Sequence, residues 1–394
     1  MWGRDIEILL SIVVPTYNEA ENVGELLERI SRAMAGKGFS YEIVIVDDSS
    51  SDGTAEVARD TASRLGIPLK LVIRSSRGLA GAVVRGFREA SGEYILVMDA
   101  DLQHPPEVAA EIIEKALKED LDLVIASRYV EGGGVEGWSI HRRIVSRLAS
   151  IAARILIPQA RRVKDPLSGF FLVRRSVIEG MENSYIERHG RSFKILLEIL
   201  VRGRYKRIAE HPYRFRPRIR GKSKLGLRES IEFLRQVMEL SDYRIPKFML
   251  VGSTGVVVNN LVLYTLTGYL NIPVYIASPI AIETATINNF MLNDKWTFKR
   301  FRQIGKAYIR LAKYHVAVGL GNLVNYVVVL ALHQILGIIP ANILGIGLGF
   351  IANYLVSSEF VWEIAKNYRG SRPAHKNRKL CLKLRGIARL DHIC

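Results

Sequence analysis

The sequence predicts an α/β domain with a doubly wound, mostly parallel sheet, followed by an all-α domain of four membrane-spanning helices. Up to about residue 98, short apolar segments alternate with segments of helical periodicity, which is the order that parallel βαβ units produce. Residues 1–245 are rich in charge, whereas the next part of the chain contains long stretches with almost none. At 394 residues, the chain also exceeds what one hydrophobic core usually holds.

The soluble part begins with an expected strand at Ile8–Val14, which Pro15 stops. Turn and cap residues then lead into a helix that ends near Met34. The remaining expected elements are a strand at Tyr41–Val46, a helix ending at Leu65, a strand at Pro68–Ile73, a helix at Gly78–Ala90 and a strand at Tyr94–Met98. This order places the strand ends along one rim, where open α/β sheets bind ligands.

Two carboxylates follow the last of these strands. Asp99 and Asp101 are separated by one residue, so both can reach one hard cation such as Mg²⁺ or Mn²⁺. Gln103 continues the i, i+2, i+4 series with a neutral oxygen ligand. Such a cation would bridge a diphosphate, which favours a transferase with a nucleotide-activated donor. The alternative is an ordinary strand-end turn in which Asp99 caps a helix.

Three further polar residues follow the earlier strands and fit a nucleotide. Tyr17 offers a ring face to a base, Asp48 can accept a hydrogen bond from a base N–H, and Glu19 can reach a ribose or base. Each residue alone is more typical of a turn or cap, but their occurrence at successive strand ends favours a nucleotide site. The sequence has no Walker A loop and no G-x-G-x-x-G motif, so neither P-loop nor dinucleotide chemistry is indicated.

Four apolar stretches have the length that a bilayer-spanning helix requires. They are Leu250–Leu270, Val274–Leu292, Tyr314–Ile339 and Ala341–Ser358, and Glu283 is the only Asp, Glu, Lys or Arg residue in them. Basic residues gather between the second and third stretches and in the tail, which by the positive-inside rule makes this loop, the tail and the N-terminal domain cytoplasmic. The net charge of +17 therefore indicates attraction to anionic lipid, not to nucleic acid.

Two basic amphipathic segments, Ile140–Ile157 and Leu227–Tyr243, are expected to lie in the membrane interface. The alternative is that their apolar sides pack against the sheet. In the first segment Arg142 and Ser146 are one helical turn apart, and together with Arg128 they can grip a lipid phosphate.

Several motifs carry a family resemblance. They are Val13–Glu19, Val46–Thr54, Met98–Pro106, Ser127–Tyr129, Asp165–Phe171 and Gly221–Leu225, in that order. Over roughly residues 8–245 the chain resembles the family 2 polyprenyl-phosphate glycosyltransferases, which implies a GT-A type, Rossmann-like sheet. The region with Phe248–Gly252 and Asn288–Phe298 is similar to GtrA-like membrane domains.

The resemblance implies a metal-dependent, inverting transfer of mannose from GDP-mannose to a polyprenyl phosphate such as dolichyl phosphate, at a membrane and without nucleic acid. Asp101 and Arg128 would carry the catalysis, with Mg²⁺ or Mn²⁺ on Asp99, Asp101 and Gln103. The donor would be held by Pro15, Tyr17, Glu19, Val46, Asp48, Asp99, Ala100, Asp101, Gln103, Arg128, Arg218 and Lys224, and the acceptor phosphate by Arg128, Arg142 and Ser146.

Two alternatives stay open. One is transfer of glucose or another sugar from a UDP-sugar, since no residue was identified that reads the sugar's 2-hydroxyl. The other is a lipid-linked sugar carrier or flippase component whose soluble part senses nucleotide. The expected domains are a catalytic domain at 1–226, an interfacial helix at 227–245, a membrane domain at 246–364 and a basic tail at 365–394 that is predicted to be disordered.

Overall fold

The structure, a computed structural model, describes residues 9–75, 78–179, 181, 194–217, 227–302 and 305–364. The chain forms two compact units, Met1–Asp242 and Tyr243–Cys394. The predicted tail at 365–394 lies outside the described residues, and so do Arg218 and Lys224 of the predicted donor site. The predicted boundaries at 226 and 245 lie on either side of the division between the units.

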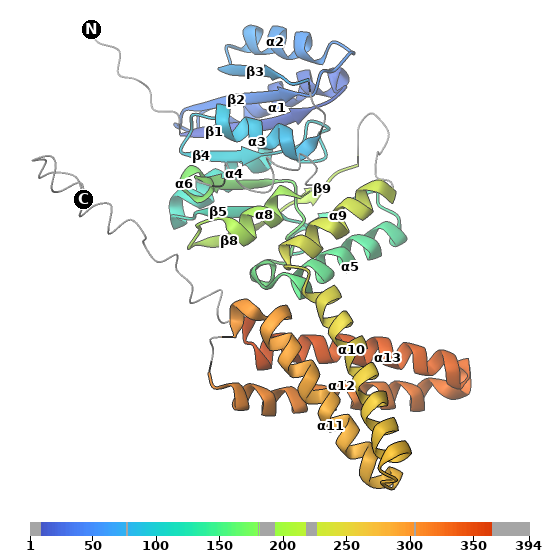
Figure 1. The fold of residues 1–394 in the computed structure, drawn as a ribbon. Helices are drawn as coiled ribbons and strands as arrows, with labels where there is room; N and C mark the ends of the chain where they lie inside the picture. The colour runs from blue at the N-terminus through green and yellow to red at the C-terminus, as the bar shows by residue number, and fades with distance from the viewer. Residues whose placement is uncertain are drawn as a thin grey trace, which may run out of the picture. The chain divides into compact units, whose positions relative to one another are not determined.

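A seven-stranded sheet of order β3-β2-β1-β4-β7-β5-β8 organises the first unit (Figure 1). Its strands are β1 Leu10–Thr16, β2 Tyr41–Asp47, β3 Leu69–Ile73, β4 Tyr94–Val97, β5 Leu123–Ser127, β7 Phe171–Arg174 and β8 Ile208–Pro212. All neighbours are parallel except β7, which runs antiparallel between β4 and β5. The expected mostly parallel sheet is confirmed, and its first four strands lie where the apolar runs predicted them.

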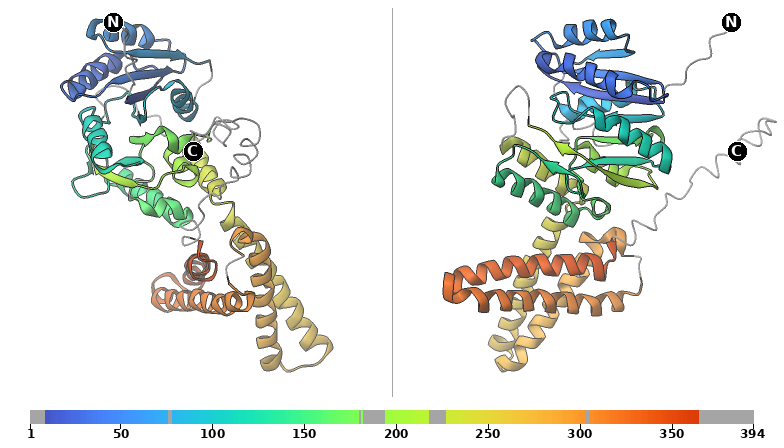
Figure 2. Two further views of the ribbon diagram at one scale, coloured as in Figure 1. Left: turned by 90° about the vertical axis from the view of Figure 1, so that its left-hand side faces the viewer. Right: turned by 180° about the vertical axis from the view of Figure 1, so that it is seen from behind.

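Helices cover both faces of this sheet, because successive strand residues point to opposite sides. In β2, Ile43 and Ile45 belong to one hydrophobic core and Val44 and Val46 to the other. The first core contains residues of α1 (Ala20–Met34), α2 (Thr54–Leu65) and α4 (Glu107–Glu119), and the second contains residues of α3 (Leu79–Glu89) and α8 (Ile195–Arg202). Figure 2 shows the sheet between these two helical layers, as a doubly wound fold requires.

The two predicted amphipathic segments form helices, α5 (Ile140–Leu156) and α9 (Leu227–Leu240). On α5, Ile140, Ile144 and Leu148 are 78%, 52% and 59% exposed, so most of the apolar side is left uncovered within the unit. The outcome for α9 is mixed, because Val237 is buried in the second core. Part of the apolar side of α9 therefore packs against the sheet, which is the alternative to a position in the membrane interface. The connections hold the short elements η1 (Pro158–Arg162) and α6 (Arg175–Ile178).

A second sheet in this unit has two strands. It pairs β6 (Gly134–Val135) with β9 (Arg214–Phe215) in parallel. The backbone of Arg214 is therefore held in a strand.

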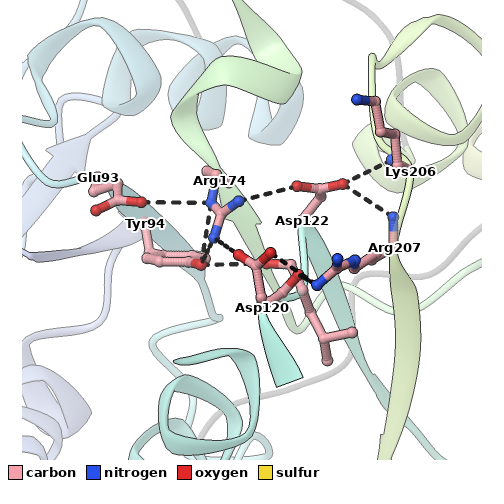
Figure 3. A network of polar contacts seen from close by, with 8 residues as sticks. Glu93, Tyr94, Asp120, Asp122, Arg174, Lys206 and Arg207 are labelled. Carbon is pink, nitrogen blue, oxygen red and sulfur yellow. Dashed lines mark hydrogen bonds and ion pairs between the residues drawn. The ribbon is translucent and has the colours of Figure 1, made fainter. Parts of the chain in front are cut away.

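A polar network ties β4, β5 and β7 together at the amino-terminal ends of the parallel strands (Figure 3). Arg174 is its centre, with guanidinium nitrogens 2.7 Å from Asp120 Oδ1 and 3.3 Å from Asp122 Oδ1. Its Nε donates to the Tyr94 hydroxyl at 3.1 Å. Asp122 also accepts the backbone N–H of Arg207 at 2.9 Å. Since ligands bind at the opposite ends of the strands in this class of fold, the network serves stability.

The second unit consists of long helices, α10 (Arg244–Tyr264), α11 (Val274–Leu292), α12 (Ala307–Leu336) and α13 (Ile338–Val356), with π-helical turns η2 (Thr265–Tyr269), η3 (Asn293–Thr297) and η5 (Ser357–Val361) and the short η4 (Lys299–Phe301). Small residues allow the helices to approach closely: a Cβ added at Gly321 would lie 2.8 Å from the carbonyl oxygen of Gly349. Buried Asp294 joins η3 to α12 and to the residue after η5, since it accepts Arg310 Nε at 2.9 Å and Trp362 Nε1 at 3.0 Å.

Three helices in the described part of the chain are long and apolar enough to cross a membrane, Arg244–Tyr269, Ala307–Leu336 and Ile338–Val361. The four expected helices of the membrane domain all form, and α11 is the one of the four that does not meet this criterion. Its polar residues include Glu283, Asn288 and Asn289. The Glu283 carboxylate lies 3.0 Å from Nε2 of His315 on α12, which is the neighbouring-helix partner that sequence analysis considered for it.

Candidate active site

The strand ends of β1, β2 and β4 are brought together at one rim. Pro15 lies opposite Val46 in the β1–β2 pairing, and β4 joins the other side of β1 as far as Val97. Tyr17, Asp48 and Asp99 follow these three neighbouring strands within two residues of their ends. Pro15 and Val46 themselves are buried in the sheet, so they can form the floor of a site but offer no polar side-chain contact.

The acidic residues predicted to hold the nucleoside already have partners in the protein. Asp48 accepts Arg74 Nη1 at 2.8 Å on one oxygen and the backbone N–H of Gly78 at 2.7 Å on the other. Glu19 Oε2 accepts the amide of Asn22 at 2.7 Å. A base or ribose would therefore meet an Asp48 carboxylate that is fixed in orientation and uses its remaining lone pairs. Arg74 was not predicted, because nothing in its local pattern shows that it faces Asp48.

The acidic turn after β4 departs from the strand geometry that sequence analysis assumed. β4 ends at Val97, and Leu102 has a left-handed φ of 59°, so the i, i+2, i+4 series does not continue along one strand face. The turn nevertheless keeps its polar groups close together. Asp101 Oδ1 accepts the backbone N–H of Gln103 at 3.1 Å, and Ala100 between the two aspartates is buried. The Asp101 residue is 5% exposed, whereas the Asp99 side chain is 38% exposed.

The buried ring of His104 supports the turn that carries Asp99 and Asp101. Its Nδ1 accepts the backbone N–H of Asp99 at 3.0 Å, and its ring stacks on Phe170 with centroids 5.0 Å apart. Burial lowers the pKa of His104 to about 4, so the ring is neutral at physiological pH. Neutrality fits the geometry, because Nδ1 must carry a lone pair to accept this hydrogen bond. Sequence analysis included His104 in a motif without giving it a role.

The turn offers hard oxygen ligands of the kind that Mg²⁺ and Mn²⁺ prefer. The described residues contain no group of three or more His, Cys, Asp or Glu side chains that could hold a metal ion. Asp99, Asp101 and the amide oxygen of Gln103 therefore fit a cation only as a partial set, which the oxygens of a bound diphosphate would complete.

Arg128 is fixed by a carboxylate that sequence analysis did not assign. Asp165, fully buried, accepts Arg128 Nε at 2.7 Å, Nη2 at 2.8 Å and the backbone N–H at 3.1 Å. Burial alone would lower the pKa of Arg128, but the adjacent Asp165 carboxylate outweighs burial and raises it above its ordinary value. The guanidinium is thus permanently charged and held in one orientation.

Aromatic rings connect Arg128 to the other two residues of the predicted phosphate site. The Arg128 Cζ lies 5.8 Å from the Trp138 ring centroid, and that of Arg142 lies 4.2 Å from the same ring. The hydroxyl of Ser146 lies 2.8 Å from that of Tyr129, whose ring centroid is 5.3 Å from the Arg128 Cζ. The structure therefore brings Arg142 and Ser146 to Arg128 through Trp138 and Tyr129.

Beside Arg128 lies a pocket of about 600 Å³ between β6, β9 and the start of α5. Its lining is strongly basic and includes Arg128, Arg143, Arg147 and Arg214, with Tyr129, Glu136, Ile140 and Ile144 among the remainder. Arg143 and Arg147 were not predicted, although their spacing on the expected helix could have indicated a shared face.

Strand β9 joins this pocket to the acidic turn. Arg214 lines the pocket, and Phe215 packs against His104 with ring centroids 5.7 Å apart. The next residue, Arg216, exchanges two hydrogen bonds with Gln103: its N–H donates to the Gln103 carbonyl at 3.1 Å and its carbonyl accepts Gln103 Nε2 at 3.1 Å. The carboxylate-bearing and arginine-bearing sites are consequently adjacent and share one rigid segment.

Comparison with known proteins gives matches over both units. Residues 11–181 match glycosyl transferase family 2, and residues 247–362 match the GtrA/DPMS transmembrane domain. A dolichol-phosphate mannosyltransferase of Pyrococcus furiosus is 44% identical over 90% of this chain and 99% of the relative. Proteins of the same name from Mycosarcoma maydis and Saccharomyces cerevisiae are 36% and 35% identical, covering 68% and 60% of this chain and 89% and 88% of the relatives.

Solved structures also align with part of the chain. Glucosyl-3-phosphoglycerate synthase from Mycobacterium tuberculosis has a TM-score of 0.42 at 20% identity and covers 61% of this chain and 85% of its own. Mannosyl-3-phosphoglycerate synthase from Rubrobacter xylanophilus has a TM-score of 0.42 at 20% identity, with 61% and 74% covered.

Proposed function

The chain belongs to the dolichol-phosphate mannosyltransferase family, and we propose that it transfers mannose from GDP-mannose to dolichyl phosphate or a related polyprenyl phosphate, with inversion at the anomeric carbon. The observation that carries the proposal is the linkage of the two sites by β9. A turn suited to a nucleotide diphosphate lies next to a pocket suited to a phosphate acceptor, and Arg216 ties the pocket's strand to the turn.

The acceptor phosphate needs little chemical activation, because it is already an anion at neutral pH. The protein must instead bring two anions together and hold them in line. Arg128 suits this task, since Asp165 fixes its guanidinium and leaves it charged in a mostly buried position. We assign the acceptor phosphate to Arg128 and Arg142, with Ser146 supporting the arrangement through Tyr129.

The donor half of the site has to stabilise the leaving diphosphate. Asp99, Asp101 and Gln103 would hold a divalent cation, which when bound supplies positive charge to the diphosphate oxygens as they gain charge. Hydrogen bonds that this turn donates to His104 Nδ1 and to the Arg216 carbonyl keep it in shape. The nucleoside would lie over Pro15, Tyr17 and Val46, with Glu19 and Asp48 as acceptors. Arg218 and Lys224 stay predictions for the donor phosphates.

The second unit is a membrane domain of the GtrA/DPMS type, which keeps the catalytic unit next to a lipid substrate. We further propose that the catalytic unit is cytoplasmic, on the evidence of the basic residues between α11 and α12 and the absence of acidic or basic residues at 271–273 and 337–340. The exposed apolar side of α5 would then lie in the lipid interface.

The experiment is transfer of radiolabel from a panel of GDP- and UDP-sugars to organic-extractable lipid, using full-length protein in detergent with dolichyl phosphate, with and without EDTA. The proposal predicts EDTA-sensitive transfer from GDP-mannose alone. Transfer from a UDP-sugar would show that the donor is not GDP-mannose. Transport of lipid-linked sugar without transfer from any donor would show that the protein is a carrier and not a transferase.

A further inference from the structure

The pocket beside Arg128 has an excess of positive charge that the described residues do not neutralise. Arg128 is paired with Asp165, and Arg214 Nη1 lies 3.9 Å from Glu136 Oε1. Within the described residues, Arg143 and Arg147 form no ion pair. Four guanidinium groups against two carboxylates leave an excess of two positive charges at one pocket.

We propose that Arg143 and Arg147 are further acceptor-binding residues, and that this pocket receives the phosphate monoester and first isoprene units of the acceptor lipid. The inference rests on the proposed function and extends its acceptor site from Arg128 and Arg142 to the neighbouring face of α5. A phosphate monoester carries a charge of about −1.5 to −2 at neutral pH, which matches the excess in the pocket. A phosphodiester headgroup of a bilayer lipid carries only one negative charge.

The helical geometry supports this assignment. Arg143 and Arg147 are four residues apart on α5, so their side chains lie on one face with Ile140 and Ile144, and all four residues line the pocket. Ionic and apolar groups thus alternate along one wall, as a ligand with a charged head and a hydrocarbon chain requires. The exposed apolar side of α5 continues beyond the pocket at Leu148, which gives the remaining chain a path into lipid.

Tyr129 connects the α5 face that carries Arg147 to Arg128, which is proposed to hold the reacting phosphate. Its ring centroid lies 5.9 Å from the Arg147 Cζ and 5.3 Å from the Arg128 Cζ, so both guanidinium groups lie near one ring. The two like charges repel each other, and a phosphate bound near both would offset this repulsion. The hydroxyl contact with Ser146 fixes the ring, which makes Ser146 a positioning residue for the pocket and not a direct ligand of the phosphate.

The test measures equilibrium binding of farnesyl phosphate and of uncharged farnesol to full-length protein in detergent, for the wild type, Arg143→Gln, Arg147→Gln and the double variant. Arg235→Gln is the matched control, because Arg235 is an exposed arginine on α9 outside the pocket. We expect the Kd for farnesyl phosphate to rise about tenfold or more with each substitution, since each removes a charged donor. Farnesol binding and the control variant should be unchanged.

Kinetics with the same variants separate the acceptor role from attraction to the bilayer. KM for a short polyprenyl phosphate should rise in detergent without phospholipid, while kcat and KM for the donor stay within twofold, and Arg147→Lys should recover most of the loss. The inference is overturned if Kd for farnesyl phosphate is unchanged, or if activity falls only in vesicles of anionic phospholipid. Neither outcome contradicts the proposed function, which is tested by whether the wild type transfers mannose.

Discussion

Removing the charge of Asp165 tests whether the acceptor site depends on a fixed Arg128. The Asp165→Asn variant leaves the Arg128 guanidinium, only 9% exposed, without its counter-ion and replaces an acceptor with an amide N–H₂ that faces a donor. Breaking one side of a buried ion pair costs about 3–5 kcal/mol, which is a large part of the 5–15 kcal/mol that a folded domain has. For a unit of this size the midpoint of thermal unfolding should fall by about 6–20 °C.

A double-mutant cycle separates this structural cost from the catalytic one. Arg128→Met alone leaves the buried Asp165 carboxylate without its counter-ion and should destabilise the unit to a similar degree. The double variant Arg128→Met with Asp165→Asn removes both charges and should recover most of the stability. Transfer activity should stay lost in the double variant, because the phosphate has no fixed arginine. The assays are thermal unfolding in detergent and mannosyl transfer at several acceptor concentrations. An Asp165→Asn variant with unchanged stability and unchanged KM for the acceptor would refute the reasoning.

Further predictions address the cation, the interface and the membrane domain. Asp101→Asn should lose most transfer activity while the unfolding midpoint changes little, and retained turnover at saturating metal would contradict the assignment. EDTA should abolish transfer and added Mg²⁺ or Mn²⁺ should restore it, as measured by product formation. Activity in metal-free buffer would contradict the assignment of a cation to this site. Leu148→Glu should reduce transfer in vesicles but not to a short acceptor in detergent, because Leu148 is 59% exposed on α5; equal activity in both would show that α5 does not contact lipid. Arg310→Met should destabilise the second unit by about 3–5 kcal/mol, because it leaves the buried Asp294 without its bidentate partner; urea unfolding monitored by tryptophan fluorescence checks this, and an unchanged midpoint would contradict it.

Elements that local pattern determines could be predicted from the sequence. The first four strands and the helices between them follow from short apolar runs and helical periodicity, and their observed ends differ from the expected ones by a few residues. The placement of β7 between β4 and β5 could not be predicted in this way. Its antiparallel direction depends on pairing between distant segments, for which periodicity carries no signal.

The same distinction applies to the candidate site. Asp99, Asp101 and Gln103 could be named as candidates because they are close in sequence and follow a recognisable strand. The groups that orient the site are remote: Asp165 is 37 residues from Arg128, and Arg216 is 113 residues from Gln103. Their side chains acquire a role only when the chain folds.

The α5 helix shows what periodicity can and cannot decide about a site. A spacing of four residues correctly indicates that Arg142 and Ser146 share a face, but it applies equally to Arg143 and Arg147 on the neighbouring face. The choice between the faces is made by the rings packed against them. Trp138 holds the Arg142 guanidinium and Tyr129 holds the Ser146 hydroxyl, while Arg143 and Arg147 are left to line the pocket. On the proposal above, the face with Arg143 and Arg147 therefore extends the acceptor site that Arg128 and Arg142 begin.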